Sequence, residues 1–293
     1  MQETEIGQDN GFQIENIGHE DLTPPNIAAQ NVWWDYSWRY RVPINITHEN
    51  PATLEEFQVL IEIDLNDWIN NGEMQEDGDD IRFTDSTNTV ELYYWIEEFG
   101  GVGEDTEIWV RVPELSTDEL IYMYFGNEEA QAASSLDDTM DEGFRYFYYH
   151  STTGNRFNDF RGTDVHPNAP YFTFSGGTIV QLEGNTWEDR HEYLAIRFEG
   201  WIINNGEGTH DFRMFTDDGI RIYVDGGDDL LIGDGWRNQA RTQYDTSYVF
   251  SSPVSIVLEW YENTGSAVCE LGWNPPGGDY QMPIPGSHLR NRK

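Results

Sequence analysis

The chain has 293 residues and carries 54 acidic against 16 basic side chains, a formal net charge of -38 at neutral pH. A chain of this length is long enough for two domains, each with its own core. Such a negative surface repels phosphate backbones, and no stretch interleaves basic with aromatic residues. Nucleic acid is therefore excluded as an expected partner.

The acidic excess predicts a protein adapted to molar salt, from a halophilic archaeon or its virus. In dilute buffer the self-repulsion opposes compaction, whereas at about 1 M salt the Debye length falls to ~3 Å. The 11 Trp, 16 Tyr and 15 Phe distinguish the chain from an acidic disordered protein. We expect dialysis into dilute buffer to unfold it, with loss of the near-UV CD signal. An unchanged spectrum would contradict this prediction.

Residues 1–31 lack periodicity and predict an extended N-terminal arm, which is ordered when it self-associates or docks on a neighbouring structural subunit. The chain starts with a polar stretch at Met1, shows no export signal and contains no 18-residue apolar span. Membrane insertion is not expected. If the domains prove to be of an extracellular type, the missing export signal favours a virion component that is assembled in the cytoplasm.

Apolar residues alternate with polar ones in short runs along most of the chain, a period typical of β-strands. The runs "RVPINIT", "QVLIEIDL", "EIWVRV" and "LIYMYFG" come first, and "EYLAIRFEGW", "DFRMFT", "IRIYVDG" and "SIVLEWYE" follow. The pattern breaks over 128–143, where we expect a linker. The sequence thus predicts an all-β protein with two β-sandwich, jelly-roll-like domains in series, at 32–127 and 144–289, and a tail at 290–293.

Three polar or reactive features of these runs have competing interpretations. The loop "EDGDDIRF" gathers Glu76, Asp77, Asp79 and Asp80, which suits either a solvated acidic loop or Ca²⁺. Asn45 begins the sequon "NIT" on the polar face of its strand, and it is either glycosylated or plain strand surface. The single cysteine, in the strand-like run "SAVCELGW", is expected to be a small buried hydrophobe.

The first domain resembles the domain of unknown function DUF2341. The resemblance is carried by "WDYSWRYRVPINIT", "QVLIEIDL", "GDDIRFTDS", "LYYWIEEF", "TEIWVRVPELS" and "IYMYFGN", in that order over 34–127. It implies a jelly-roll-like sandwich of the lectin sort, found in cell-surface proteins of archaea and bacteria, and no activity.

The second domain resembles the PA14 domain, which occurs in toxins, glycosidases and adhesins. "FRYFYYHS", "AIRFEGWI", "DFRMFTDDGIRIYVDG", "LIGDGW", "SIVLEWYENTG" and "MPIPGSHL" carry the resemblance. In its lectin branch two adjacent aspartates joined by a cis peptide bind Ca²⁺, and the ion coordinates sugar hydroxyls. The residues of this chain that match or neighbour that site are the predicted metal ligands Asp217, Asp218 and Asn263, with Glu262 and Trp236 added as ligand-binding residues. Trp187 is a second candidate for stacking on a sugar.

The same aspartates also fit a plain turn, with Gly219 supplying a positive φ, because PA14 domains outside the lectin branch keep similar sequences without binding sugar. No phosphate cradle, zinc-protease helix or nucleophile elbow is present in the sequence. We therefore expect no enzyme, with Ca²⁺ as the possible cofactor and a cell-surface glycan or S-layer glycoprotein as the partner.

Three settings fit these features. The favoured one is a projection of a haloarchaeal virion (a turret, spike or tail fibre) with a glycan-recognition domain. The alternatives are a cellular pilus, S-layer-associated or envelope adhesin subunit, and an accessory carbohydrate-binding unit of a glycosidase. All three place the protein outside the cell or on a virion surface, in high salt.

Overall fold

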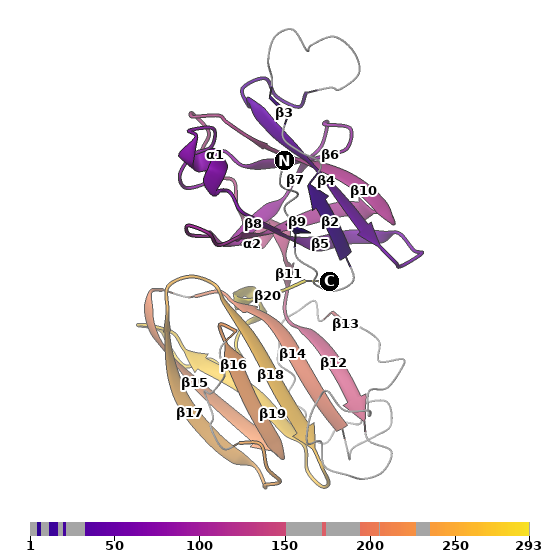
Figure 1. Cartoon of the computed structure of the whole chain (residues 1–293). Coiled ribbons are helices and arrows are strands. Elements are labelled where there is room, and N and C mark those ends of the chain that lie inside the picture. Colours follow the sequence, from indigo (N-terminus) through magenta and orange to yellow (C-terminus); the bar gives the residue numbers. More distant parts are fainter. Residues whose placement is uncertain are drawn as a thin grey trace. The chain divides into compact units, whose positions relative to one another are not determined.

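The computed structural model describes residues 33–150, 194–204, 206–226 and 235–292, together with short strands at 5–6, 12–16, 20–21 and 172–173. These residues form two compact units, Met1–Met140 and Asp141–Lys293. Nearly all regular structure is β (Figure 1), which confirms the predicted fold class. The division between the units falls inside the predicted linker 128–143, which contains a short helix and a short strand.

The first unit is built from two antiparallel sheets. One has the strand order β1-β2-β4-β10-β6-β7, with β3 also on β4, and the other has the order β5-β9-β8. The elements are β1 (Glu5–Ile6), β2 (Phe12–Asn16), β3 (Glu20–Asp21), β4 (Tyr40–His48), β5 (Leu54–Ile63), α1 (Asn66–Asn70), β6 (Arg82–Asp85), β7 (Glu91–Leu92), β8 (Tyr94–Glu98), β9 (Thr106–Leu115), β10 (Asp118–Phe125) and α2 (Leu136–Thr139).

The alternating residues of these strands form the core between the two sheets. In β4, Val42, Ile44 and Ile46 are fully buried, and Ile44 pairs with Ile121 of β10. Ile61 of β5 is fully buried as well. Full burial of one such side chain stabilises the fold by about 1.5–3 kcal/mol, so this row is a main contribution to the stability of the unit. The period-two prediction is confirmed for these strands.

The N-terminal arm pairs with its own chain. β2 runs antiparallel to β4, with Ile14 opposite Ile46, β1 pairs with β2, and β3 pairs with β4 at Arg41. The sequence predicted that this segment self-associates or docks on a neighbouring subunit, which a single chain does not test. Within one chain, its short strands extend the sheet at β4.

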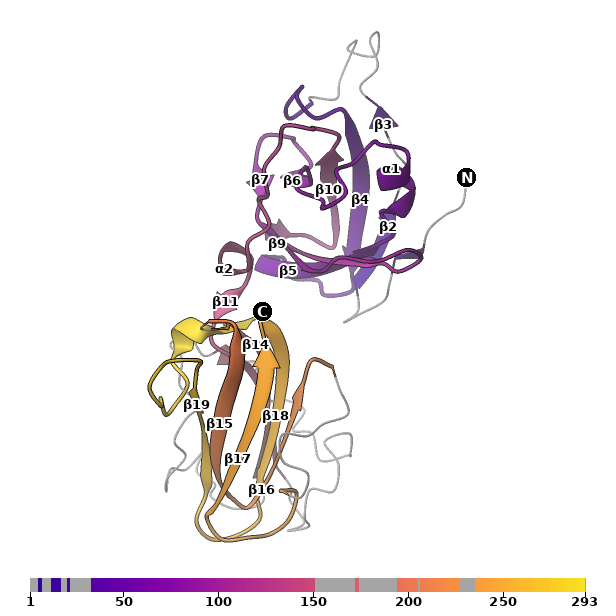
Figure 2. The ribbon, with the colours of Figure 1, turned by 90° about the vertical axis from the view of Figure 1, so that its left-hand side faces the viewer.

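The second unit also has two sheets, whose main layers are the order β16-β18-β14 and the three strands β17-β15-β19 (Figure 2). The first of these continues from β14 through β12 to β13, and through β20 to β11. The elements are β11 (Asp141–Glu142), β12 (Arg145–His150), β13 (Phe172–Thr173), β14 (Leu194–Ile202), β15 (Gly208–Asp217), β16 (Gly219–Val224), β17 (Thr242–Phe250), β18 (Val254–Glu262), β19 (Val268–Asn274), the 3-10 helix η1 (Gly286–His288) and β20 (Leu289–Asn291).

Inward-facing residues of both layers form the second core. Leu258 and Trp260 of β18 face Met214 of β15 and Trp273 of β19, and all four are buried in one hydrophobic cluster. Cys269 belongs to the same cluster, and burial raises the pKa of its thiol, so it is the buried hydrophobe that the sequence predicted.

Among the residues that the structure describes, no helix has the length and apolar character needed to cross a bilayer.

Candidate metal and glycan site

The two adjacent aspartates lie where the chain passes from one layer of the second unit to the other. Asp217 ends β15 and pairs with Val268 of β19, whereas Gly219 begins β16 and pairs with Tyr261 of β18. Asp218 lies between these strands, and the peptide bond between Asp217 and Asp218 is cis. The cis bond is the geometry that the PA14 resemblance implies.

A third carboxylate, that of Glu262, joins this pair from the C-terminal end of β18. One carboxylate oxygen from each of Asp217, Asp218 and Glu262 lies within 4.8 Å of the others. Glu262 is fully buried, and the two aspartates are 8% and 5% exposed. Glu262 was predicted as a ligand-binding residue, and the register of β18 brings it to the aspartates because Tyr261 pairs with Gly219 directly beside Asp218. The structure therefore assembles three buried carboxylates from two distant segments.

Backbone amides on both sides hold the Asp218 carboxylate. The amide of Gln239 donates to Oδ1 at 2.8 Å, and the amide of Asn263 donates to Oδ2 at 2.8 Å. Asn263, predicted from the sequence as a metal ligand, thus contacts Asp218 through its main chain, and its role as a ligand stays a prediction. A carboxylate held by two amides keeps lone pairs for a further partner.

The electrostatics of the cluster favour a cation. Burial raises the pKa of Asp217, the neighbouring Asp218 charge raises it further, and a hydrogen bond from the Arg241 backbone opposes both effects. Within the described part of the chain, neither aspartate forms a salt bridge. The Arg241 guanidinium lies over the Phe215 ring and pairs with Glu270 at 2.9 Å. The negative charge of the aspartate pair is therefore not balanced by this nearby cation.

Trp236 packs on Tyr261 of β18 and is not a free platform. The Arg221 guanidinium sits 4.2 Å from the centre of its ring, and Tyr261 meets it edge to face at 4.6 Å. Trp236 packs with Ala195 and Tyr261. A sugar stacking here would meet a half-buried indole with one face under Arg221. Trp187, the other predicted stacking residue, lies outside the described residues.

The backbone conformation of Gly219 contradicts the plain-turn interpretation, which requires a positive φ at this residue. It is not among the residues with positive φ. A Cβ at this position would lie 1.9 Å from Cε1 of Tyr261, so the position excludes a side chain because the Tyr261 ring packs on the backbone. Positive φ values occur instead at Asp225 (59°) and Gly226 (61°), in the turn that directly follows β16.

The acidic loop of the first unit has a structural role at Asp80. Its carboxylate accepts hydrogen bonds from the backbone amides of Gln75 (3.2 Å), Gly126 (2.6 Å) and Asn127 (3.2 Å). Asp77 accepts from the amide of Asp79, which closes a local turn. In the described residues, the three carboxylates of the second unit are the metal-type cluster, and this loop contributes none. The Asp80 carboxylate is held by three backbone amides, and a Ca²⁺ site in this loop stays an untested prediction.

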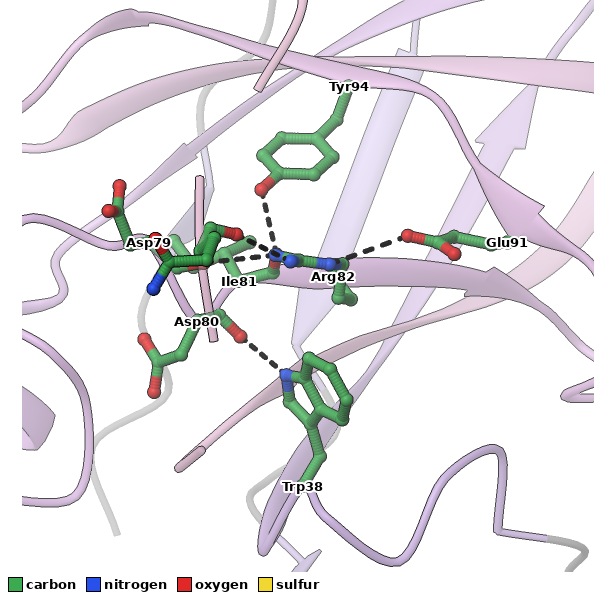
Figure 3. A network of polar contacts seen from close by, with 8 residues as sticks. Trp38, Asp79, Asp80, Ile81, Arg82, Glu91 and Tyr94 are labelled. Carbon is green, nitrogen blue, oxygen red and sulfur yellow. Dashed lines mark hydrogen bonds and ion pairs between the residues drawn. The ribbon is translucent and has the colours of Figure 1, made fainter. Parts of the chain in front are cut away.

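A polar network fixes the same segment to the sheets of the first unit (Figure 3). The Trp38 indole donates to the Asp80 carbonyl at 2.7 Å, and the Tyr94 hydroxyl donates to the Ile81 carbonyl at 2.7 Å. The Arg82 guanidinium donates to that same Ile81 carbonyl at 2.5 Å. Burial raises the pKa of Tyr94 to about 12, so this hydroxyl remains a donor at neutral pH.

We predict that Asp80→Ala destabilises the first unit by about 2–4 kcal/mol, because three partly buried backbone amides lose their common acceptor. Asp79→Ala is the matched control, since the described contacts of Asp79 use its backbone amide and carbonyl. It should change stability by less than ~0.5 kcal/mol. Urea unfolding in molar salt measures both variants. Equal midpoints for the two would contradict the structural role of Asp80.

Comparison with known proteins gives one family match and several distant similarities. The model of the family "Domain of unknown function (DUF2341)" matches residues 77–169. This is the family that the sequence indicated, but the match begins later than the expected 32–127 and extends past the boundary of the first unit. It covers less than half of the chain.

One curated relative is the anti-sigma-I factor RsgI3 of Acetivibrio thermocellus, 27% identical over 149 residues, which are 50% of this chain and 21% of the relative. The chain thus spans about a fifth of that protein. Among solved structures, an anti-sigma factor domain-containing protein is 15% identical with a TM-score of 0.39, covering 86% of this chain and 85% of that one. The PA14 sugar-binding domain of an RTX adhesin is 18% identical with a TM-score of 0.36, covering 52% and 99%.

Proposed function

We propose that the second unit is a calcium-dependent glycan-recognition module and that the chain is a surface-exposed structural or adhesion protein. The observation that supports this most is the cluster of Asp217, Asp218 and Glu262, three buried carboxylates within 4.8 Å. Burying like charges together is costly unless a cation or protons neutralise them. A hard dication matches such a set of oxygen donors.

The donor set suits Ca²⁺ in number and type. Ca²⁺ takes about six to eight oxygens at roughly 2.3–2.6 Å, from carboxylates, carbonyls and water. Asp217, Asp218 and Glu262 offer up to two carboxylate oxygens each. Asn263 is the first residue after β18, and its side-chain oxygen is the further protein ligand that we propose. Ligand positions not supplied by the protein remain for water or for sugar hydroxyls. A bound Ca²⁺ would supply a Lewis-acidic contact to vicinal hydroxyls of a glycan.

The protein residues then have separate tasks. The two aspartates and Glu262 hold the ion, and the amides of Gln239 and Asn263 orient the Asp218 carboxylate. The half-buried Trp236 packs on Tyr261, the residue that precedes Glu262. These tasks describe binding and orientation, so we propose recognition rather than catalysis.

The test is a glycan array with the full chain in molar salt, with Ca²⁺ and with chelator. We expect binding that chelator abolishes and that Asp218→Ala abolishes. Asp211→Ala is the control, because Asp211 is an exposed acid on the same strand, bonded to Ser247. Glycan or surface-layer binding that survives both chelator and Asp218→Ala would refute the mechanism.

For the biological setting we propose a projection of a haloarchaeal virion, such as a turret, spike or tail fibre, which must both assemble and attach to its host. A pilus, S-layer-associated or envelope adhesin subunit is the alternative, and an accessory unit of a glycosidase ranks below both. Deleting residues 1–30 separates the two tasks of the chain: assembly should be lost and ligand binding kept. Loss of both would contradict an independent role for the arm.

The anti-sigma-I factor offers a second candidate role, in regulation rather than attachment. Its motivation is the 27% identity over half of this chain. Since the chain covers about a fifth of that relative, the match fits a shared module better than a shared activity. Binding of the chain to a sigma factor would support regulation, whereas Ca²⁺-dependent glycan binding alone would support attachment.

A further inference from the structure

We infer that Gln239 is a positioning residue that fixes the Asp218 carboxylate for the cation. This inference rests on the proposed calcium site and assigns a residue that lies 21 positions from Asp218 and follows no recognisable motif. Three observations support it: the contacts of Gln239 with Asp218, the fixed orientation of its amide, and its link to β17.

Gln239 contacts Asp218 through both its main chain and its side chain. Its backbone amide donates to Oδ1 of Asp218 at 2.8 Å, and Nε2 donates to the Asp218 carbonyl at 2.9 Å. Nε2 also donates to the Gly235 carbonyl at 3.1 Å. One residue therefore holds the carboxylate and the carbonyl of Asp218 together, next to the cis bond.

The orientation of the side-chain amide follows from its other end. The Tyr244 hydroxyl donates to Oε1 at 2.8 Å, and Nε of Arg237 donates to the same oxygen at 3.3 Å. A guanidinium nitrogen is always a donor, so its partner is the amide oxygen and Nε2 is turned toward Asp218. Tyr244 packs against the hydrophobic core from β17. The amide is thus anchored to the core of the sandwich.

The consequence concerns the cation. Asp218 is held on its other oxygen by the Asn263 amide, so Gln239 and Asn263 fix the carboxylate from two segments of the chain. Groups that orient a metal ligand from outside the coordination shell affect metal affinity by about 10–100-fold when they are removed. Without the Gln239 side chain, the Gly235 carbonyl and the Asp218 carbonyl lose a common donor. In the variant these two carbonyls would have to become ordered when the ion binds, and this cost would make the free energy of ion binding less favourable.

The test compares Gln239→Ala and Gln239→Glu with Gln243→Ala in the full chain. Gln243 is the matched control, because it lies exposed on β17 and its side chain bonds to Asp245. Gln239→Ala keeps the backbone donor and should weaken Ca²⁺ binding about tenfold by calorimetry. Gln239→Glu keeps the acceptor for Tyr244 but has no Nε2 donor, and its added negative charge favours cation binding, so it should weaken Ca²⁺ binding less than Gln239→Ala does.

A second measurement separates positioning from a purely structural role. Urea unfolding in chelator should show that Gln239→Ala loses less free energy of unfolding, from its missing side-chain hydrogen bonds, than it loses in free energy of Ca²⁺ binding. Unchanged Ca²⁺ affinity in Gln239→Ala overturns this inference alone. Weaker affinity with an equal loss of stability in chelator also overturns it, in favour of a structural role. Absence of Ca²⁺ uptake by the wild type overturns both this inference and the proposed site.

Discussion

Asp217→Asn is expected to weaken Ca²⁺ binding at least about 100-fold, because calcium affinity depends strongly on the number of charged ligands. The substitution keeps the size of the side chain and an oxygen that can accept the hydrogen bond of the Arg241 backbone. It removes one negative charge from a cluster in which all three carboxylates are buried. Calorimetry in molar salt measures the change, and Asp211→Asn on the same strand serves as the control.

The same variant is expected to be at least as stable as the wild type when chelator is present. Burial and the Asp218 charge raise the pKa of Asp217. The ion-free fold therefore binds this proton more tightly than the unfolded chain does. The stability that Asp217 contributes is complete below its unfolded pKa and is lost as the pH rises through the folded pKa. Above the folded pKa the wild type has lost this contribution, whereas asparagine has no proton to lose.

The outcome is read from urea unfolding in the two conditions. In chelator the stability of the wild type relative to Asp217→Asn should increase as the pH falls from 7 toward the usual range of an aspartate. With Ca²⁺ at neutral pH the order should reverse, because the ion stabilises only the fold that binds it. A variant that takes up Ca²⁺ like the wild type would show that Asp217 is not a ligand. If Asp217→Asn is less stable than the wild type in chelator, the negative charge of Asp217 does not destabilise the ion-free fold.

The alternation of apolar residues predicts the strands well because it follows directly from the geometry of a two-layer sandwich. Ile44 and Trp260 are fully buried, as the pattern requires. Glu259, on the outward face of β18, departs from it. It is 2% exposed, and it pairs with Arg197 at 2.6 Å and with Arg221. An ion pair on a covered outer face depends on what packs over that face, which a local pattern does not contain.

The candidate site was only partly predictable for a similar reason. Asp217 and Asp218 were predicted because they match the adjacent aspartates of the PA14 lectin branch. Glu262 was predicted because it lies in "YENTG", where that branch is expected to have a second ligand loop. Gln239 carries no local signal: its neighbours show no periodicity, and its role depends on contacts with Asp218 and Tyr244. The environment of Gly219 likewise depends on the register that brings it to Tyr261 of β18.

Gly219→Ala is expected to destabilise the second unit by about 3 kcal/mol, the upper end of what overpacking a buried site usually costs. The new Cβ would lie 1.9 Å from Cε1 of Tyr261 and 2.6 Å from its Cδ1 and Cζ. The Tyr261 ring is fully buried, its hydroxyl donates to Asn238 at 2.9 Å, and Trp236 contacts it edge to face. The ring therefore has little room to move. Thermal unfolding in molar salt, followed by near-UV CD, measures the loss.

A double-variant cycle identifies the cause of that loss. If the clash with the ring is the mechanism, Gly219→Ala combined with Tyr261→Ala should be less destabilising than the sum of the single changes. Gly101→Ala is the control, because a Cβ there meets the end of the flexible Glu104 side chain at 3.2 Å. Since Gly219 and Tyr261 directly neighbour Asp218 and Glu262, Gly219→Ala should also weaken Ca²⁺ binding. Wild-type stability of Gly219→Ala would mean that the ring does not pack on this backbone.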